Sequence, residues 1–254
     1  MLENQDHTAL TRRSWLARTG ALGLAAVVPS GVASALAAPP EARPEPAPAT
    51  PSAALQRLVE GNRRFAQGRA TNPNRTLARL QELGTTQQPF AVVLGCSDSR
   101  VPIEILFDQG FGDVFVARVA GNIATAEVIG SIEYATEVLG AVIVLTLGHT
   151  GCGAVRATLE GTSVPGLIGS LYPYIHPAVE EVGNQGVDAV VAENARNQVD
   201  TLRNASPLLA ARLASGALRI EGSVFDFRTG LVTLLDTPPS RRLRPTPATK
   251  GTGY

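Results

Sequence analysis

Three short, largely apolar runs rich in β-branched residues constrain the fold of this chain more than any other feature. They cover residues 90–95, 113–119 and 141–147. Each has the length of a strand, and such near-continuous apolar runs are typical of parallel strands that are covered on both faces. Between the second and third runs, residues 125–139 carry apolar side chains at helical spacing, and Gly140 then ends the pattern. This order predicts an α/β fold with a central, mostly parallel β-sheet flanked by helices.

The remaining elements are less strongly patterned. Helices are expected over 53–67, 77–83, 194–204 and 207–214, and strands over 218–227 and 231–235, joined at 228–230. Residues 161–186 are expected to be loop with short helices, and His176 lies within them. Apolar residues make up 44% of the chain and aromatic residues only 5%, a balance that suits helices packed on a parallel sheet.

Residues 1–37 have the pattern of an export signal peptide. Arg12 and Arg13 precede an apolar run at 19–28, and 35–37 read Ala-Leu-Ala, a small-residue cleavage pattern. The paired arginines, followed by Ser and Trp15, resemble a twin-arginine export signal, in which Phe is the more usual aromatic residue. We therefore expect export to the periplasm or the extracellular space. An uncleaved membrane anchor is the alternative, although the apolar run is short for a bilayer span.

The rest of the chain divides into a spacer, a folded domain and a tail. Residues 38–52 are rich in proline and alanine, which favours an extended linker. Residues 53–237 form the predicted domain, and 238–254 a flexible C-terminal tail. The 22 basic and 22 acidic residues give a formal net charge of +0, so no nucleic-acid partner is expected. After signal cleavage we expect no stable membrane association.

Two short segments carry residues suited to metal chemistry. Residues 96–100 directly follow the first apolar run, and residues 149–153 directly follow the third. Parallel strands place both segments at the carboxyl edge of the sheet, where open α/β sheets bind their ligands. The segments contribute Cys96, His149 and Cys152, with Asp98 nearby. Thiolate, imidazole and carboxylate donors together favour zinc over magnesium or calcium.

These residues also have less specific interpretations. The chain has two cysteines, and in an exported protein two cysteines commonly form one disulfide, which would give a disulfide-bonded binding domain. That interpretation explains neither His149 nor Asp98. Alone, Asp98 and Arg100 would be a surface ion pair of small consequence.

A catalytic interpretation joins all five residues. Three protein ligands leave the fourth zinc position for Asp98 or for water, and zinc lowers the pKa of bound water to about 7. Arg100 offers a planar fork that can hold the Asp98 carboxylate off the metal. A carboxylate held in this way could orient the attacking hydroxide.

On these residues the chain resembles the β-class carbonic anhydrase family. Cys96–Arg100 matches Cys-x-Asp-Ser-Arg, His149–Cys152 matches His-x-x-Cys, and the resemblance runs over about 55–235. It implies reversible hydration of carbon dioxide to bicarbonate. It also implies one zinc per chain, held by Cys96, His149 and Cys152 with Asp98 as the exchangeable fourth ligand. Carbon disulfide or carbonyl sulfide hydrolysis on the same fold, and a zinc-binding protein without turnover, remain open.

The same resemblance carries expectations about assembly and substrate. It implies a homodimer or a dimer of dimers, with active sites near the subunit interface and an extra strand at the sheet edge. In some members a glutamine before the first strand helps to bind substrate. Gln87 matches that position, and Gln88 is a near alternative. Members with a regulatory bicarbonate pocket carry Trp and Tyr where this chain has Val92 or Val93 and Phe225. Although Arg118 remains, no such pocket is expected.

Overall fold

The computed structural model describes residues 47–237. The predicted export signal and the C-terminal tail therefore lie outside the described residues, as does most of the predicted linker. Across the described range, every helix is too short or too polar to cross a bilayer.

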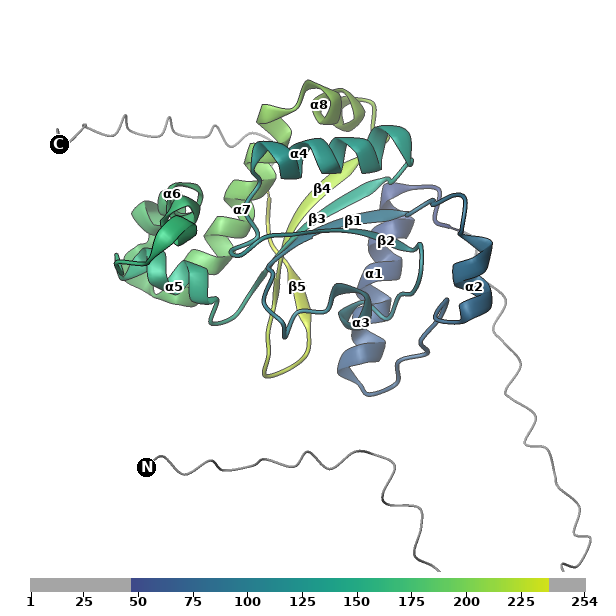
Figure 1. Ribbon diagram of the computed structural model, residues 1–254, viewed down its shortest axis with the longest axis horizontal. Helices are drawn as coiled ribbons and strands as arrows, with labels where there is room; N and C mark the ends of the chain where they lie inside the picture. Colours follow the sequence, from purple (N-terminus) through teal and green to yellow (C-terminus); the bar gives the residue numbers. More distant parts are fainter. Residues whose placement is uncertain (1–46, 238–254) are drawn as a thin grey trace, which may run out of the picture. The chain divides into compact units, whose positions relative to one another are not determined.

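A five-stranded sheet forms the centre of the domain (Figure 1). Its strands are β1 (Ala91–Gly95), β2 (Val114–Arg118), β3 (Ile143–His149), β4 (Arg219–Phe225) and β5 (Val232–Leu234). They lie in the order β2-β1-β3-β4-β5, with β1 to β4 parallel and only β5 antiparallel. The predicted mostly parallel sheet is confirmed, and its antiparallel edge strand matches the extra strand implied by the family resemblance.

Strand register explains why the two polar segments meet. Gly95, the last residue of β1, pairs with Arg118 on one side and with Leu147 on the other. Residues that follow β1 and β3 therefore leave the sheet at the same edge. β1 and β3 are buried along their whole length. This burial fixes the position of their carboxyl ends against the core.

Helices cover both faces of the sheet, as its apolar strands require (Figure 1). On one face, α1 (Pro51–Ala66) and α3 (Ile103–Leu106) pack through Leu58 and Ile103 against a cluster that includes Val93. The opposite face is covered by α4 (Ala126–Glu133), α7 (Val187–Ala205) and α8 (Pro207–Ala214), in a cluster that includes Val92. Neighbouring residues of β1 thus point into different clusters.

A third cluster lies beyond the carboxyl edge. Here α5 (Gly153–Leu159) and α6 (Tyr172–Val182) pack on α7, and both cysteines are part of this cluster. The remaining helical segments are α2 (Leu77–Glu82) and the two short 3₁₀ helices η2 (Gly166–Leu171) and η3 (Gly183–Gln185). The cysteines are therefore enclosed by apolar side chains, many of them from helices that follow them in the chain.

Several predicted boundaries differ from the structure. The helix expected over 125–139 consists of α4 followed by a π-helical turn, η1 (Tyr134–Val138). α7 begins at Val187 instead of Asn194, directly after Gly186, whose φ is 92°. α1 begins at Pro51, so 51–52 belong to the helix and not to the linker. Pro51 suits the first helical turn because its missing N–H would have no partner there.

The largest difference concerns α6, which occupies a region predicted to be loop with short helices. His176 lies on this helix and not in an irregular loop. α6 contains Pro177 and has a Pro in its first turn, features that weaken a sequence-based helix prediction. Ile175 and Ala178 are buried in the third cluster. Tertiary packing therefore stabilises a helix that local propensity disfavours.

Candidate metal centre

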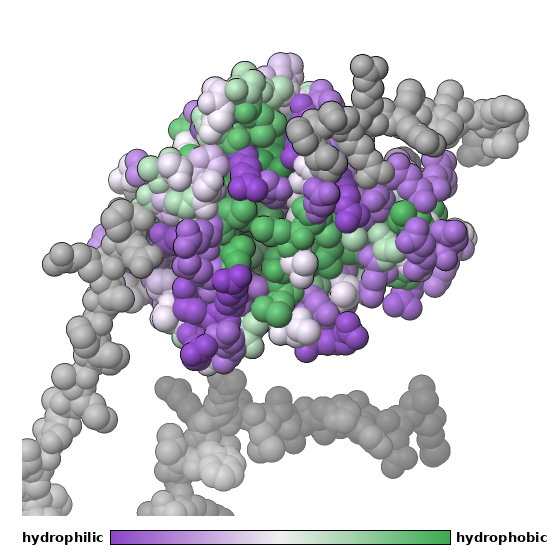
Figure 2. Space-filling view, turned by 180° about the vertical axis from the view of Figure 1, so that it is seen from behind, coloured by the Kyte–Doolittle hydropathy of each residue, from purple (hydrophilic) through white to green (hydrophobic). Residues whose placement is uncertain are grey.

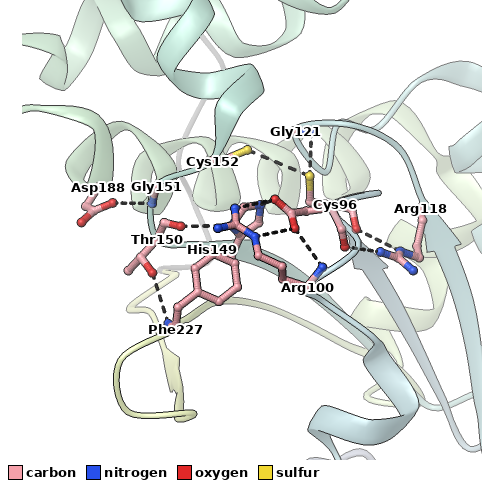
Figure 3. Close-up of polar contacts among 11 residues, drawn as sticks. Cys96, Arg100, Arg118, Gly121, His149, Thr150, Gly151, Cys152, Asp188 and Phe227 are labelled. Carbon is pink, nitrogen blue, oxygen red and sulfur yellow. Dashed lines mark hydrogen bonds and ion pairs between the residues drawn. The ribbon is translucent and has the colours of Figure 1, made fainter.

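Three side chains meet at the carboxyl edge of the sheet. Cys96 directly follows β1, His149 is the last residue of β3, and Cys152 is the N-cap of α5. Their ligand atoms all lie within 4.8 Å of one another, and all three residues are buried. Figure 3 shows these three side chains close together. The structure thus brings together the three residues that the sequence analysis singled out as ligands.

The turn from His149 to Cys152 depends on backbone contacts. Gly151 has a φ of 64°, in the left-handed region that glycine adopts without strain. Its amide donates to Asp188 Oδ1 at 2.9 Å, while the amide of Thr150 donates to the carbonyl of Phe225 at 3.0 Å. These two bonds hold the turn to the start of α7 and to the end of β4.

The two sulfur atoms are 4.0 Å apart and both cysteines are free thiols. A disulfide bond is about 2.05 Å long, so this is not a disulfide. The two sulfurs share a hydrogen bond, and Cys96 Sγ also accepts from the Gly121 amide at 3.3 Å. These contacts, aided by His149, lower the pKa of Cys96 to about 4 against the effect of burial. The contact with Cys96, together with burial, raises the pKa of Cys152.

His149 presents one nitrogen to the cysteines. Its Nδ1 lies 3.1 Å from the backbone oxygen of Thr150, which assigns the N–H to Nδ1 and leaves a lone pair on Nε2. Nε2 is buried and has no hydrogen-bond partner among the described residues. Burial lowers the pKa of His149, but the nearby Cys96 sulfur and its charge outweigh burial and raise the pKa overall.

This donor set fits a zinc ion. A buried nitrogen without a partner costs free energy, whereas two thiolates and a neutral imidazole are ordinary zinc ligands. A metal-binding histidine commonly gives its other N–H to a backbone carbonyl, as Nδ1 does to Thr150 here. Cys96, His149 and Cys152 would supply three ligands, which leaves a fourth position open.

Asp98 lies beside the cluster and is held by Arg100. The guanidinium donates from Nε to Oδ1 at 3.0 Å and from Nη2 to Oδ2 at 2.8 Å, and the Arg100 amide donates to Oδ1 at 2.9 Å. Oδ2 is also 3.8 Å from His149 Nε2. The hydrogen bonds from Arg100 hold the pKa of Asp98 well below its usual range, although burial opposes them. The carboxylate is therefore ionised, directed at the cluster and restrained.

Two further residues shape the site in ways that sequence reasoning missed. Arg118 donates from Nε to the Cys96 carbonyl at 2.9 Å and from Nη2 to the Asp98 carbonyl at 2.6 Å. The Phe227 ring lies under the Arg100 guanidinium, 4.3 Å from Cζ, and 5.1 Å from the His149 ring (Figure 3). The sequence alone assigns neither Arg118 nor Phe227 a role at the metal site. Val92, Val93 and Phe225 are buried in the core.

Gln87 is not close to the cluster of its own chain. It is exposed, in the connection between α2 and β1, and β1 separates it from Cys96. Gln87 and Gln88 line a hollow of about 690 Å³ together with Thr86, Tyr134 and Val138. The glutamine assigned from the family resemblance therefore belongs to the amino edge of the sheet, opposite the metal ligands.

Comparisons with known proteins agree with this geometry. A family model described as carbonic anhydrase matches residues 91–232. The chain is 40% identical over 191 residues to a carbonic anhydrase of Mycolicibacterium smegmatis, covering 72% of this chain and 93% of the relative. It is 38% identical over 193 residues to carbonic anhydrase 2 of Mycobacterium tuberculosis, covering 73% of this chain and 93% of the relative.

Solved structures show the same fold. A Coccomyxa β-carbonic anhydrase, in complex with acetazolamide, superposes with a TM-score of 0.56 at 27% identity. The match covers 71% of this chain and 86% of that one.

Proposed function

Because this chain belongs to the β-class carbonic anhydrase family and catalyses the reversible hydration of carbon dioxide, we propose that it does so with one zinc ion held by Cys96, His149 and Cys152. The observation that carries this proposal is the buried cluster of two sulfurs and one imidazole nitrogen within 4.8 Å of one another. Asp98 and Arg100 are proposed as the catalytic pair beside that ion.

Zinc, when bound, supplies the Lewis acidity that makes hydroxide available near neutral pH. The protein supplies position. Arg100 and the stacked ring of Phe227 restrain the Asp98 carboxylate, while Arg118 fixes the backbone that carries it. The lowered pKa of Asp98 keeps this group a hydrogen-bond acceptor at neutral pH. Asp98 would thus accept a hydrogen bond from the attacking hydroxide. This bond would direct the lone pair of the hydroxide oxygen toward carbon dioxide.

The deciding measurement is stopped-flow hydration of carbon dioxide together with zinc analysis of the same sample. Rapid hydration with about one zinc per chain is expected for a three-ligand catalytic site. Full zinc content without hydration at neutral and alkaline pH would refute the catalytic assignment. Carbon disulfide and carbonyl sulfide, assayed in parallel, would then test hydrolysis on the same site, and no turnover of any of them would indicate a zinc-binding protein without turnover.

For assembly, we propose a homodimer or a dimer of dimers in which Gln87 reaches the site of a second copy. Gln87 and its hollow lie at the opposite edge of the sheet from the metal ligands, so its own chain cannot use it there. Figure 2 shows hydrophobic residues gathered over one face of the domain, and an exposed apolar surface of that kind commonly marks a protein interface. Tyr134 and Val138, beside Gln87 in the hollow, are 47% and 66% exposed.

We also propose export to the periplasm or the extracellular space through a twin-arginine-type signal at residues 1–37. The paired Arg12 and Arg13, the apolar run at 19–28 and the small residues at 35–37 support it. Replacement of both arginines by lysine should retain the full-length chain inside the cell. Unchanged export of that variant would refute the twin-arginine route.

A further inference from the structure

The segment from Gly121 to Ala124 packs directly behind the Cys96 sulfur. The Gly121 amide donates to Cys96 Sγ at 3.3 Å (Figure 3). A side chain does not fit at this position, because a Cβ at Gly121, where φ is 78°, would lie 2.8 Å from the Cδ1 of Ile175. An N–H donor to a ligand sulfur withdraws charge from it and orients it, which tunes a metal site.

Two amide side chains on α7 hold this segment. Asn194 donates from Nδ2 to the Gly121 carbonyl at 2.9 Å, and Gln198 accepts from the Ala124 amide at 2.8 Å. Asn194 and Gln198 are 0% and 2% exposed, so water does not compete for these bonds. Their spacing of four residues places both on the same face of the helix.

The pair is also bonded internally. Gln198 Nε2 donates to Asn194 Oδ1 at 2.9 Å and to the Tyr174 carbonyl on α6 at 3.3 Å. Both ends of each amide are therefore used, and the orientation of Asn194 is fixed by Gln198. A fully bonded buried network of this kind adopts one arrangement, since any rotation would leave a buried polar group unpaired.

We propose that Asn194 is a positioning residue for the metal centre, oriented by Gln198, which holds the Gly121 amide against the Cys96 sulfur. This inference rests on the proposal that Cys96 binds zinc. Among the described residues, no hydrogen bond joins Asn194 to Cys96, His149 or Cys152, so it acts through one peptide segment.

A matched control exists on the same helix. Thr146 of β3 donates from Oγ1 to the Ala195 carbonyl of α7 at 2.8 Å, and this bond is also buried. Thr146→Val removes a buried contact between α7 and the sheet without altering the 121–124 segment. It should lower the stability of the protein as Asn194→Ala does, but leave zinc binding unchanged.

The test measures zinc affinity by competition with a chromophoric chelator, and the sulfur-to-metal absorption band of the cobalt-substituted protein. Asn194→Ala should weaken zinc binding by about tenfold, a loss that is ordinary for a group behind a metal ligand. It should also move the band to lower energy, since a sulfur without its N–H donor is richer in charge. Unchanged affinity and an unchanged band in Asn194→Ala would overturn the inference, as would an equal loss of affinity in Thr146→Val.

Gln198→Met gives a second variant if Asn194→Ala does not fold. It removes the bond that orients Asn194 and the bond to the Ala124 amide but keeps the Asn194 side chain, so a change in the same direction is expected, and no change would overturn the inference. A wild-type chain that binds no zinc would overturn the proposed metal site together with this inference. Unchanged zinc binding in the variants alone would overturn only the role of Asn194.

Discussion

The two edges of the parallel sheet differ in how far each is complete within one chain. At the carboxyl edge, Cys96, His149 and Cys152 are buried and face one another. Hydrogen bonds between side chains and the backbone hold the loops that carry these residues. At the amino edge, Gln87 is exposed beside a hollow whose lining includes Tyr134 and Val138. The carboxyl edge holds all three candidate metal ligands within one chain. The amino edge presents apolar and amide side chains at the surface, where a second chain could contact them.

This difference separates two parts of the function. Metal binding needs several groups within a few ångströms, which one chain provides by ending two parallel strands side by side. A substrate contact can be made by a single group, and that group can come from a second chain. We therefore expect substitutions at the carboxyl edge to abolish activity. Substitutions at the amino edge should only reduce activity, and an unaltered second chain in the dimer should restore it.

The largest effect is expected for His149→Ala. Loss of one of three buried ligands should remove zinc and lower the rate of hydration at least about 10³-fold, roughly 4 kcal/mol of transition-state stabilisation. Metal analysis and stopped-flow kinetics on the same sample check this. His176→Ala is the control, because His176 is exposed on α6, where it pairs with Glu180. Equal zinc content in both variants would refute the assigned ligand.

Arg100→Ala should have the next largest effect. Without its two guanidinium bonds, the Asp98 carboxylate can turn to the open metal position and close it. We expect a rate lower by about 10²-fold at neutral pH, roughly 2.7 kcal/mol, with zinc fully retained. Asp226 and Arg228 form the same type of pair on either side of Phe227, and among the described residues no hydrogen bond joins them to a candidate ligand, so Arg228→Ala is the matched control. Full activity of Arg100→Ala would show that Asp98 needs no restraint.

A smaller effect is expected at the amino edge. Gln87→Ala should lower the rate by about tenfold, roughly 1.4 kcal/mol, and leave zinc unchanged. When Gln87→Ala and His149→Ala chains are refolded together, mixed dimers combine an intact metal site with an intact glutamine from the other chain. About one quarter of all sites should then be fully active if the copies pair at random in a two-fold dimer. Activity no greater than the sum of the separate variants would place Gln87 in its own chain's site or in none.

The smallest effect on catalysis is expected from Asp108→Asn, which alters the attachment of the α1–α2 connection. Asp108 accepts from Arg64, from the Thr71 amide and hydroxyl, and from the Asn72 amide. Burial alone would raise the pKa of Asp108, but these bonds outweigh burial and lower it. Its contribution to stability is therefore full above the ordinary carboxyl pKa of about 3.9 and falls as pH drops through the lowered folded value.

Asp108→Asn should be less stable than wild type by about 2 kcal/mol at neutral pH, since bonds to a buried charged group are lost. The difference should shrink as the pH falls below about 4, because the wild type then loses the same contribution. Urea unfolding at neutral and acidic pH measures both quantities. A difference that stays constant with pH would show that the charge of Asp108 does not contribute.

The sequence by itself determined the fold class and the ligands. Near-continuous apolar runs at 90–95 and 141–147 require a sheet covered on both faces, and parallel strands must end at one edge. Polar residues directly after two such strands therefore meet where the strands are neighbours, as β1 and β3 are. Local sequence also placed Asp98 and Arg100 two residues apart, close enough for the pair that the structure contains.

Only the tertiary structure decided what surrounds those ligands. α6 forms because Ile175 and Ala178 are buried, against the local effect of Pro177. The contacts of Asn194 with Gly121, and of Phe227 with Arg100, join residues far apart in the chain, and neither pair has a recognisable spacing. Periodicity shows which face of an element is buried, but not which element covers it. That choice depends on the packing of all the helices at once, which no single segment of sequence contains.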